Sequence, residues 1–229
     1  MTARRNTATS GDVATAVSDP IKIDIWSDIA CPWCYIGKRR LETAVQGFDG
    51  EVEIEYHSFE LAPDTPVDFE GSEIDFLAGH KHMPEDQVRS MLAQMTELAA
   101  GEGLSYDFGA LQHTNTRLAH EALHEAKAQG RQTQFKERLL AAYFEEGRHV
   151  GRVDELVDLG TEIGLDPSAL RAALTDGAHR EAVQADIDQA RAYGIGGVPF
   201  FVIEGRWAVS GAQAPEVFTD ALTRAEAER

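Results

Sequence analysis

Two stretches of alternating apolar and polar residues flank a helical pattern near the start of the chain. The first stretch runs from Ile21 to Trp26 and the second from Val52 to Phe59, and alternation of this kind is typical of a half-buried strand. Between them, apolar residues recur at helical spacing from Pro32 to about Phe48, and proline is well suited to the first position of a helix. This order predicts a β-α-β unit over residues 20–60 with two parallel strands.

The strand pattern is absent from the middle of the chain, residues 61–190, where only helical patterns occur. We therefore predict an all-α helical insertion in this segment. Its expected helices cover Pro84 to Ala100, Asn115 to Gln129, Thr133 to Glu145, Val153 to Ile163, and the residues from Pro167 onward behind the cap Asp166.

The last segment, residues 191–229, returns to a strand pattern. Phe200 to Glu204 and Trp207 to Ser210 flank Gly205-Arg206, which predicts a hairpin with a two-residue turn, and Pro215 opens a final helix. Without the insertion, the elements form one small sheet with helices on it, so the fold class is α/β.

Composition and charge narrow the classes of partner. Asp and Glu number 39 and Lys and Arg 21, a net charge of −18, which repels phosphate backbones and anionic lipids. No apolar run of about 18 residues occurs, so we expect neither a nucleic acid nor a membrane as a partner. Residues 1–19 contain Arg4-Arg5 but no apolar segment of a signal peptide. We expect a disordered N-terminal tail and a cytoplasmic protein.

The chain contains two cysteines, and they stand three residues apart in Cys31-Pro32-Trp33-Cys34. The pair follows a predicted strand and begins a predicted helix, where free N–H groups and the helix dipole favour a thiolate on Cys31. Cys34, about one turn into the helix, can attack a mixed disulfide on Cys31 and release the substrate. A structural zinc site would need four ligands, and no second cysteine pair exists. The sequence therefore predicts redox chemistry, with Cys31 and Cys34 as catalytic residues and no metal.

An uncharged loop, Gly194 to Phe201, precedes the first strand of the hairpin. Pro199 stands at the entrance of this strand, a position at which proline marks an edge or a special turn. A phosphate-binding loop would be followed by a helix, and here a strand follows. Phosphate binding is therefore excluded.

Together, these motifs resemble the DsbA family of thiol–disulfide oxidoreductases, and specifically its FrnE-like cytoplasmic branch. The resemblance covers about residues 21–225 and implies a thioredoxin fold with a large all-α helical insertion. It also implies that Pro199 is cis and faces the cysteines, and that the backbone of Val198 pairs with an extended substrate. Its most specific parts are Ser27-Asp28, Cys31-Pro32-Trp33-Cys34-Tyr35-Ile36-Gly37-Lys38, Asn115-Thr116 with Ala119-His120, Gly194 to Phe201, and Ala208 to Gln213.

Pro32, Trp33, Val198 and Pro199 are accordingly the expected substrate-binding residues. Potentials in such folds range from about −270 to about −120 mV, and Trp33 offers no imidazolium to stabilise a thiolate. We therefore expect a disulfide reductase or isomerase near the reducing end. Its substrates would be protein or small-molecule disulfides and its reductant an unidentified partner. No cofactor is expected besides the redox-active cysteine pair, with glutathione as a possible co-substrate.

Three other interpretations stay open. A glutathione-dependent isomerase or transferase of the kappa type resembles the same fold but usually has serine in place of Cys31. His120-Glu121-Ala122-Leu123-His124 matches the HExxH motif of zinc proteases, with Glu145 or Glu146 as third ligand. The helical spacing, however, predicts a solvated face for His120, Glu121 and His124. The third interpretation, an acidic module that only binds another protein, would leave the thiols unused.

The general base that deprotonates Cys34 is also left open by the sequence, and the candidates are Asp28, Glu60 and water.

Overall fold

The computed structural model describes residues 19–229, and the tail expected over residues 1–19 lies outside this range except for Asp19. Four strands form one sheet in the order β2-β1-β3-β4. Its strands are β1 (Ile21–Ser27), β2 (Val52–Ser58), β3 (Phe200–Ile203) and β4 (Trp207–Ser210). β1 and β2 are parallel, whereas β3 is antiparallel to both β1 and β4. The predicted β-α-β unit and hairpin are confirmed.

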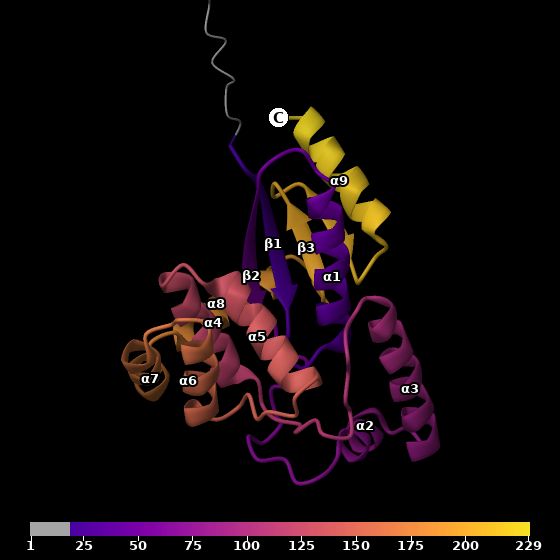
Figure 1. Ribbon diagram of the computed structural model, residues 1–229, viewed down its shortest axis with the longest axis vertical. Coiled ribbons are helices and arrows are strands. Elements are labelled where there is room, and N and C mark those ends of the chain that lie inside the picture. The colour runs from indigo at the N-terminus through magenta and orange to yellow at the C-terminus, as the bar shows by residue number, and fades with distance from the viewer. Residues whose placement is uncertain (1–18) are drawn as a thin grey trace, which may run out of the picture.

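Helices cover both faces of the sheet. On one face, α1 (Pro32–Gln46) and α9 (Pro215–Ala227) pack together, as the upper half of Figure 1 shows. Alternate strand residues such as Ile23, Ile25 and Phe201 point into the core beneath these helices, because side chains along a strand alternate between its faces. The opposite face places Trp26 against Ala190 of α8 (Arg180–Ala192).

The segment between β2 and β3 is helical apart from its connecting loops and has a core of its own (Figure 1). This core extends to Ile29, Tyr35 and Ile36 beside the cysteine pair, so the inserted helices support the site directly. Besides α8, the helices are α2 (Glu73–Lys81), α3 (Glu85–Gly101), α4 (Arg117–Ala128), α5 (Gln132–Phe144), α6 (Val153–Glu162) and α7 (Pro167–Asp176).

Three local expectations differ from the structure. Helix α2 was not predicted, because its apolar residues do not gather on one face; a capping box between Ser72 and Asp75 begins it. The helix from Pro167 ends at Asp176, where Gly177 adopts a left-handed φ of 65°, and α8 begins afresh. The hairpin turn has three residues, since Ile203 pairs with Trp207 and both Glu204 and Gly205 have positive φ.

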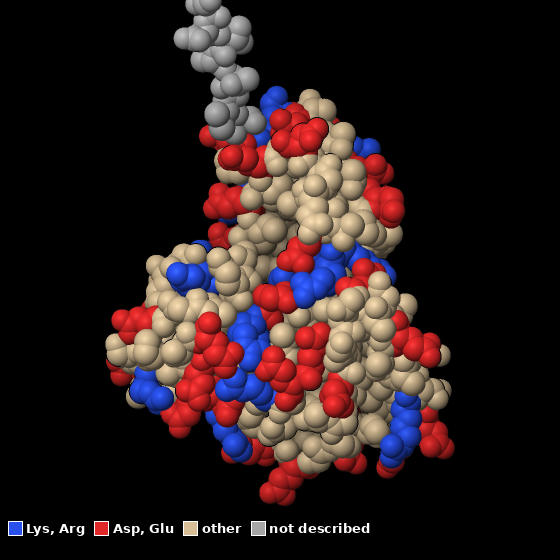
Figure 2. Space-filling view, viewed as in Figure 1, with Lys and Arg blue, Asp and Glu red and all other residues tan. Residues whose placement is uncertain are grey.

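No described helix is long and apolar enough to cross a membrane. Acidic side chains are spread over most of the face shown in Figure 2, with lysines and arginines often beside them. Several arginines and lysines form ion pairs, such as Arg138 with Glu146 and Glu162.

Candidate functional site

The cysteine pair lies where β1 passes into α1. Cys31 is the N-cap residue, with φ −95° and ψ 110°, and Pro32 follows at the first helical position. The amide of Cys34 donates to the carbonyl oxygen of Cys31 over 3.0 Å, which closes the first turn. Both side chains are buried, each 3% exposed, and both are free thiols. Cys31 lines a cavity, whereas Cys34 lies behind it and does not.

The Val198–Pro199 peptide is cis, as the resemblance implies, and it lies against the cysteine pair. The thiol of Cys31 donates to the carbonyl oxygen of Val198 over 3.5 Å. Gly37 allows this approach, because a Cβ atom there would lie 2.9 Å from Cγ of Pro199. The structure thus brings together residues 31 and 198, which are far apart in the sequence.

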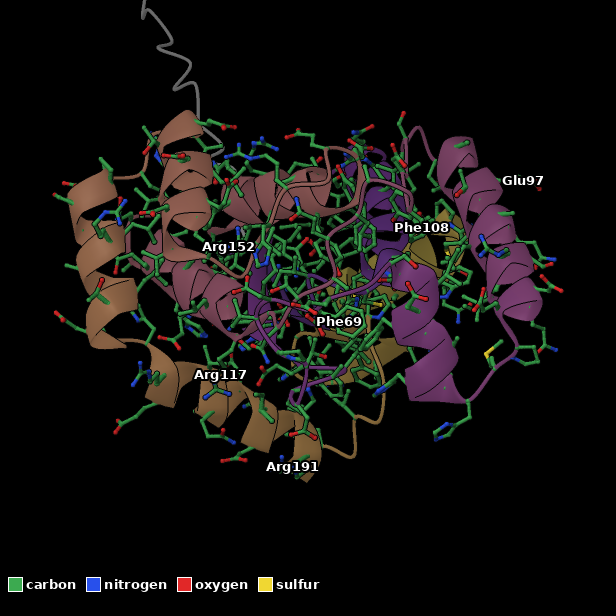
Figure 3. The ribbon with its side chains drawn as sticks, turned by 90° about the horizontal axis from the view of Figure 1, so that it is seen from below. Phe69, Glu97, Phe108, Arg117, Arg152 and Arg191 are labelled. Carbon is green, nitrogen blue, oxygen red and sulfur yellow. The ribbon has the colours of Figure 1, made fainter. Side chains whose placement is uncertain are left out.

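A cavity of about 340 Å³ opens beside Cys31. Trp33, Gly197 and Val198 border it on the side of the sheet, and apolar side chains of α2 and α3 border it on the other. Figure 3 places Phe108, another lining residue, inward of α3, whereas Glu97 lies on the outer side of that helix. All four predicted substrate-binding residues are near this cavity: Pro32, Trp33 and Val198 line it, and Pro199 follows Val198. A mostly apolar cavity next to a thiol can hold an apolar group attached to a sulfur atom.

Asp28 is a buried residue that lines this cavity. Its carboxylate accepts from the amide of Leu61 over 2.8 Å, and Nε2 of His120 lies 3.3 Å from it. Burial raises the pKa of Asp28, but these hydrogen bonds outweigh burial and lower the pKa. Asp28 is therefore a carboxylate in the fold. Glu60, the other carboxylate considered as a base, pairs instead with Arg117.

The prediction of a solvated face for the HExxH segment is wrong. His120 is 1% exposed and Glu121 2% exposed, because α4 packs between several other helices, including α5, α7 and α8. His124 lies 3.0 Å from Asp186, so the two imidazoles face different carboxylates, Asp28 and Asp186. Among the described residues, the group of three potential metal ligands is Asp24, Glu55 and His57, which includes neither histidine of the motif. The geometry therefore does not support the zinc-protease alternative.

The two thiols differ in their electrostatic surroundings. Burial raises the pKa of Cys34, but a hydrogen bond from Cys31 and the charge of Lys136 outweigh it, so the pKa of Cys34 is lowered. The pKa of Cys31 is raised well above its ordinary value, first by its side-chain interaction with Cys34 and then by burial. The two buried thiols are thus tightly coupled, and the thiolate on Cys31 expected from the sequence stays a prediction.

Sequence reasoning missed two residues that contact or surround the motif. The hydroxyl of Tyr106 donates to the carbonyl oxygen of Pro32 over 2.7 Å. Lys136 of α5 is 1% exposed and lies near Cys34. Tyr106 stands in a loop without periodicity, so no signal identified it. Lys136 could have been found, because it shares a helical face with the buried residues Gln132 and Leu140.

Known proteins resemble this chain in sequence and in fold. The family model of the DSBA-like thioredoxin domain matches residues 22–223. The crystal structure of a probable DsbA oxidoreductase from Streptomyces coelicolor is 39% identical, with a TM-score of 0.86 and 91% of each chain covered. An uncharacterized protein of Bacillus subtilis (strain 168), YwbO, is 28% identical over 205 residues, 89% of this chain and 96% of that protein.

A more distant likeness shows the fold alone. The cytosolic disulfide reductase DsbM from Pseudomonas aeruginosa, solved with GSH, is 21% identical, with a TM-score of 0.63 and coverage of 89% of this chain and 98% of that one. The expected thioredoxin fold with additional helices is confirmed. The chain therefore belongs to the family of DSBA-like thioredoxin domains, a family of thiol–disulfide oxidoreductases.

Proposed function

We propose that this protein reduces or isomerises disulfides through its cysteine pair, with Cys31 as the attacking and Cys34 as the resolving residue. One observation carries the assignment of roles: Cys31 faces the cavity, whereas Cys34 lies behind it. A substrate disulfide in the cavity can reach the sulfur of Cys31 alone. The intermediate mixed disulfide then lies within reach of Cys34, one turn further along α1.

The reaction transfers two electrons from the cysteine pair to the substrate disulfide and passes on one proton. The reduced pair holds one proton and one negative charge. With the proton on Cys34, the sulfur of Cys31 attacks one sulfur of the substrate, breaks its S–S bond and expels the first product as a thiolate. Cys34 then gives its proton to this thiolate and attacks the sulfur of Cys31. A Cys31–Cys34 disulfide forms and the second product leaves as a thiolate, so the substrate gains two electrons.

Val198 and Pro199 would present the substrate, with Pro32 and Trp33 beside it. Trp33 is 40% exposed at the rim of the cavity, where a large aromatic ring can pack on the residue next to a substrate sulfur. A substrate that adds as a strand along the backbone of Val198 is bound through its main chain, so many side-chain sequences are tolerated. This supports a broad range of disulfide substrates.

We place the reaction in the cytoplasm, with the pair kept mainly as a dithiol by a reductant that is not identified. The Pro32-Trp33 dipeptide and the similarity in fold to a reductase described as cytosolic support this direction. Glutathione is the simplest electron donor, because it is also the main thiol buffer of that compartment.

Two serine variants and one titration test the proposal. We expect Cys31→Ser to abolish exchange with model disulfides and Cys34→Ser to accumulate a mixed disulfide, measured by mass spectrometry after alkylation. In graded glutathione buffers, the wild-type protein should show a reversible two-electron transition near about −230 mV or below. A transition near about −120 mV would indicate an oxidant instead. His120→Ala tests the zinc-protease alternative. Loss of bound zinc together with loss of activity in this variant would contradict the assignment.

One observation favours a second candidate, a glutathione-dependent enzyme acting on a small molecule. The apolar cavity beside Cys31, about 340 Å³ in volume, has the size of a small-molecule site. This candidate requires a stable glutathione adduct or bound glutathione without a dithiol–disulfide transition. The same titration therefore separates the two candidates.

A further inference from the structure

A buried histidine and a buried glutamate form a pair in the wall of the cavity beside Cys31. Glu73, the first residue of α2, and His113, in the loop before α4, both line this cavity. They are 8% and 5% exposed, and Nδ1 of His113 lies 2.7 Å from Oε2 of Glu73. Apolar side chains could join α2 to the core without removing two polar groups from water. The pair therefore calls for an explanation beyond packing.

Neighbouring side chains fix the orientation of the His113 ring. Phe76 of α2 stacks on this ring, with the two centroids 3.4 Å apart. Phe69, labelled in Figure 3, meets the ring edge-on with centroids 5.7 Å apart. The hydroxyl of Tyr143 lies 3.4 Å from Nδ1. Because Nδ1 faces Glu73 and the plane of the ring is fixed, the direction of Nε2 is fixed as well.

The other ring nitrogen, Nε2 of His113, is left for a ligand. Within residues 19–229 it makes no hydrogen bond, and it is not among the fully buried polar atoms that lack a partner. It is therefore open to the cavity. Other polar groups of the wall have partners already: the carboxylate of Asp28 accepts from a backbone amide, and the hydroxyl of Thr114 donates to a backbone carbonyl. His80 and Lys81 are exposed, so water can satisfy them.

We propose that His113 is a specificity-determining residue whose Nε2 forms a hydrogen bond with a hydroxyl or amide group of the substrate, and that Glu73 positions its ring. An imidazole nitrogen accepts a hydrogen bond when the ring is neutral and donates one when the ring is protonated. A hydroxyl or amide group matches both states, whereas a hydrocarbon group matches neither.

The inference rests on the proposed function and narrows its substrate class. Cys31 and His113 line the same cavity of about 340 Å³, so one ligand can contact both residues. Such a ligand has its sulfur atom at Cys31, an apolar body between the apolar side chains of α2 and α3, and a hydroxyl or amide group at His113. The favoured substrates are disulfides of this kind.

Two aromatic disulfides that differ in one polar group on each ring test the inference. They are diphenyl disulfide and the more reactive of its 3- and 4-hydroxyphenyl analogues. His113→Asn retains an N–H group that can donate to Glu73 in place of Nδ1, but it lacks Nε2. We expect this variant to lower the rate constant for the hydroxyphenyl disulfide about tenfold, because one hydrogen bond is lost. The rate constant for diphenyl disulfide should stay within about twofold of the wild-type value.

Both rate constants are measured by stopped-flow kinetics of the reduced protein. Each variant is compared with the wild type on the same substrate, so that the different intrinsic reactivities of the two disulfides cancel. Glu73→Gln keeps an oxygen that can accept from Nδ1–H. It should therefore cause a smaller selective loss than His113→Asn.

His179→Asn is the matched control. His179 also pairs with a glutamate, since its Nε2 lies 2.8 Å from Oε2 of Glu125, but it does not line the cavity. This variant should leave both rate constants within about twofold of the wild-type values.

Trapped mixed disulfides provide a measurement that does not depend on the folding of a His113 variant. In Cys34→Ser, Cys31 is loaded with benzenethiol or with its hydroxyl-bearing analogue. We expect the nitrogen-15 resonance of His113 Nε2 to shift between the two adducts, because only the second carries a group that hydrogen-bonds to it. The resonances of His179 should stay unchanged.

Three outcomes would overturn the inference. His113→Asn slows the reactions of both disulfides equally, His179→Asn causes the same selective loss, or the Nε2 resonance of His113 is identical in the two adducts. Failure of the proposed function is distinguishable, because the wild-type protein would then react with neither disulfide.

Discussion

At the scale of single residues, Gly37 controls how closely α1 approaches the cis-proline loop. A Cβ atom at this position would lie 2.9 Å from Cγ of Pro199 and 3.4 Å from both Ala212 and Phe201. We expect Gly37→Ala to lower the free energy of unfolding by about 1–3 kcal/mol through overpacking. The gain of about 0.5–1 kcal/mol that alanine brings to a helix interior opposes this loss. Urea unfolding of the reduced protein measures the difference.

The same substitution should slow disulfide exchange, because it displaces Val198 from the sulfur of Cys31. Gly47→Ala is the matched control at the end of the same helix. Its Cβ atom would meet nothing closer than 3.7 Å, and its φ of −92° suits alanine. If both variants lost stability equally, the close packing against Pro199 would not be the reason.

At the scale of elements, a chain of carboxylates and imidazoles joins the sheet to the inserted helices. His57 of β2 lies 2.8 Å from Asp24 of β1 and 2.9 Å from Asp186 of α8. It also stacks on Trp26 at 4.6 Å. Burial lowers the pKa of His57, but hydrogen bonds with Asp186 and Asp24 outweigh it and raise the pKa to about 9. This residue therefore holds β1, β2 and α8 together as a cation.

The raised pKa predicts a pH dependence of stability. Because protonated His57 binds its proton more tightly in the folded state, its contribution of up to about 3 kcal/mol is complete below about pH 6.5. The contribution is lost as the pH rises from about 6.5 to 9. Urea unfolding across this range, monitored by tryptophan fluorescence, should show it. His57→Asn should lower stability at pH 6 and remove most of the slope; an unchanged slope in this variant would assign it to other groups.

At the scale of the whole molecule, the cavity lies between loops of the sheet and two inserted helices, α2 and α3. Cys31 and Val198 belong to the loops of the sheet, whereas Leu77 and Leu92 belong to α2 and α3. We expect Leu77→Glu to slow exchange with a disulfide that carries an aromatic group by about tenfold, because a carboxylate in an apolar cavity disfavours such a ligand. Exchange with a small hydrophilic disulfide should change much less. Stopped-flow kinetics on both substrates measure the two rates.

Leu98→Glu provides the control for a charge added to the same pair of helices. Leu98 is 44% exposed on α3 and does not line the cavity. Its substitution should leave both rates unchanged. Equal slowing by Leu77→Glu and Leu98→Glu would show that added negative charge, and not the cavity, is responsible.

Local patterns by themselves determined the elements that carry the chemistry. Alternation in Ile21 to Trp26, helical spacing after Pro32 and the three-residue spacing of Cys31 and Cys34 are properties of neighbouring residues, and they predicted the strand, the helix and the cysteine pair. The hairpin and most inserted helices were predicted for the same reason. The resemblance to a family then connected residues 31 and 199, which no local pattern relates.

Only the tertiary structure decided which side chains are buried and which groups share a proton. The face of α4 that carries His120 and Glu121 looks polar in the sequence, yet neighbouring helices and Asp28 enclose it. The carbonyl oxygen of Val198 accepts from the thiol of Cys31, and Lys136 is buried near Cys34. Both groups reach the dithiol from far along the chain. Burial and electrostatic interactions depend on distance in space, so spacing along the sequence could not reveal them.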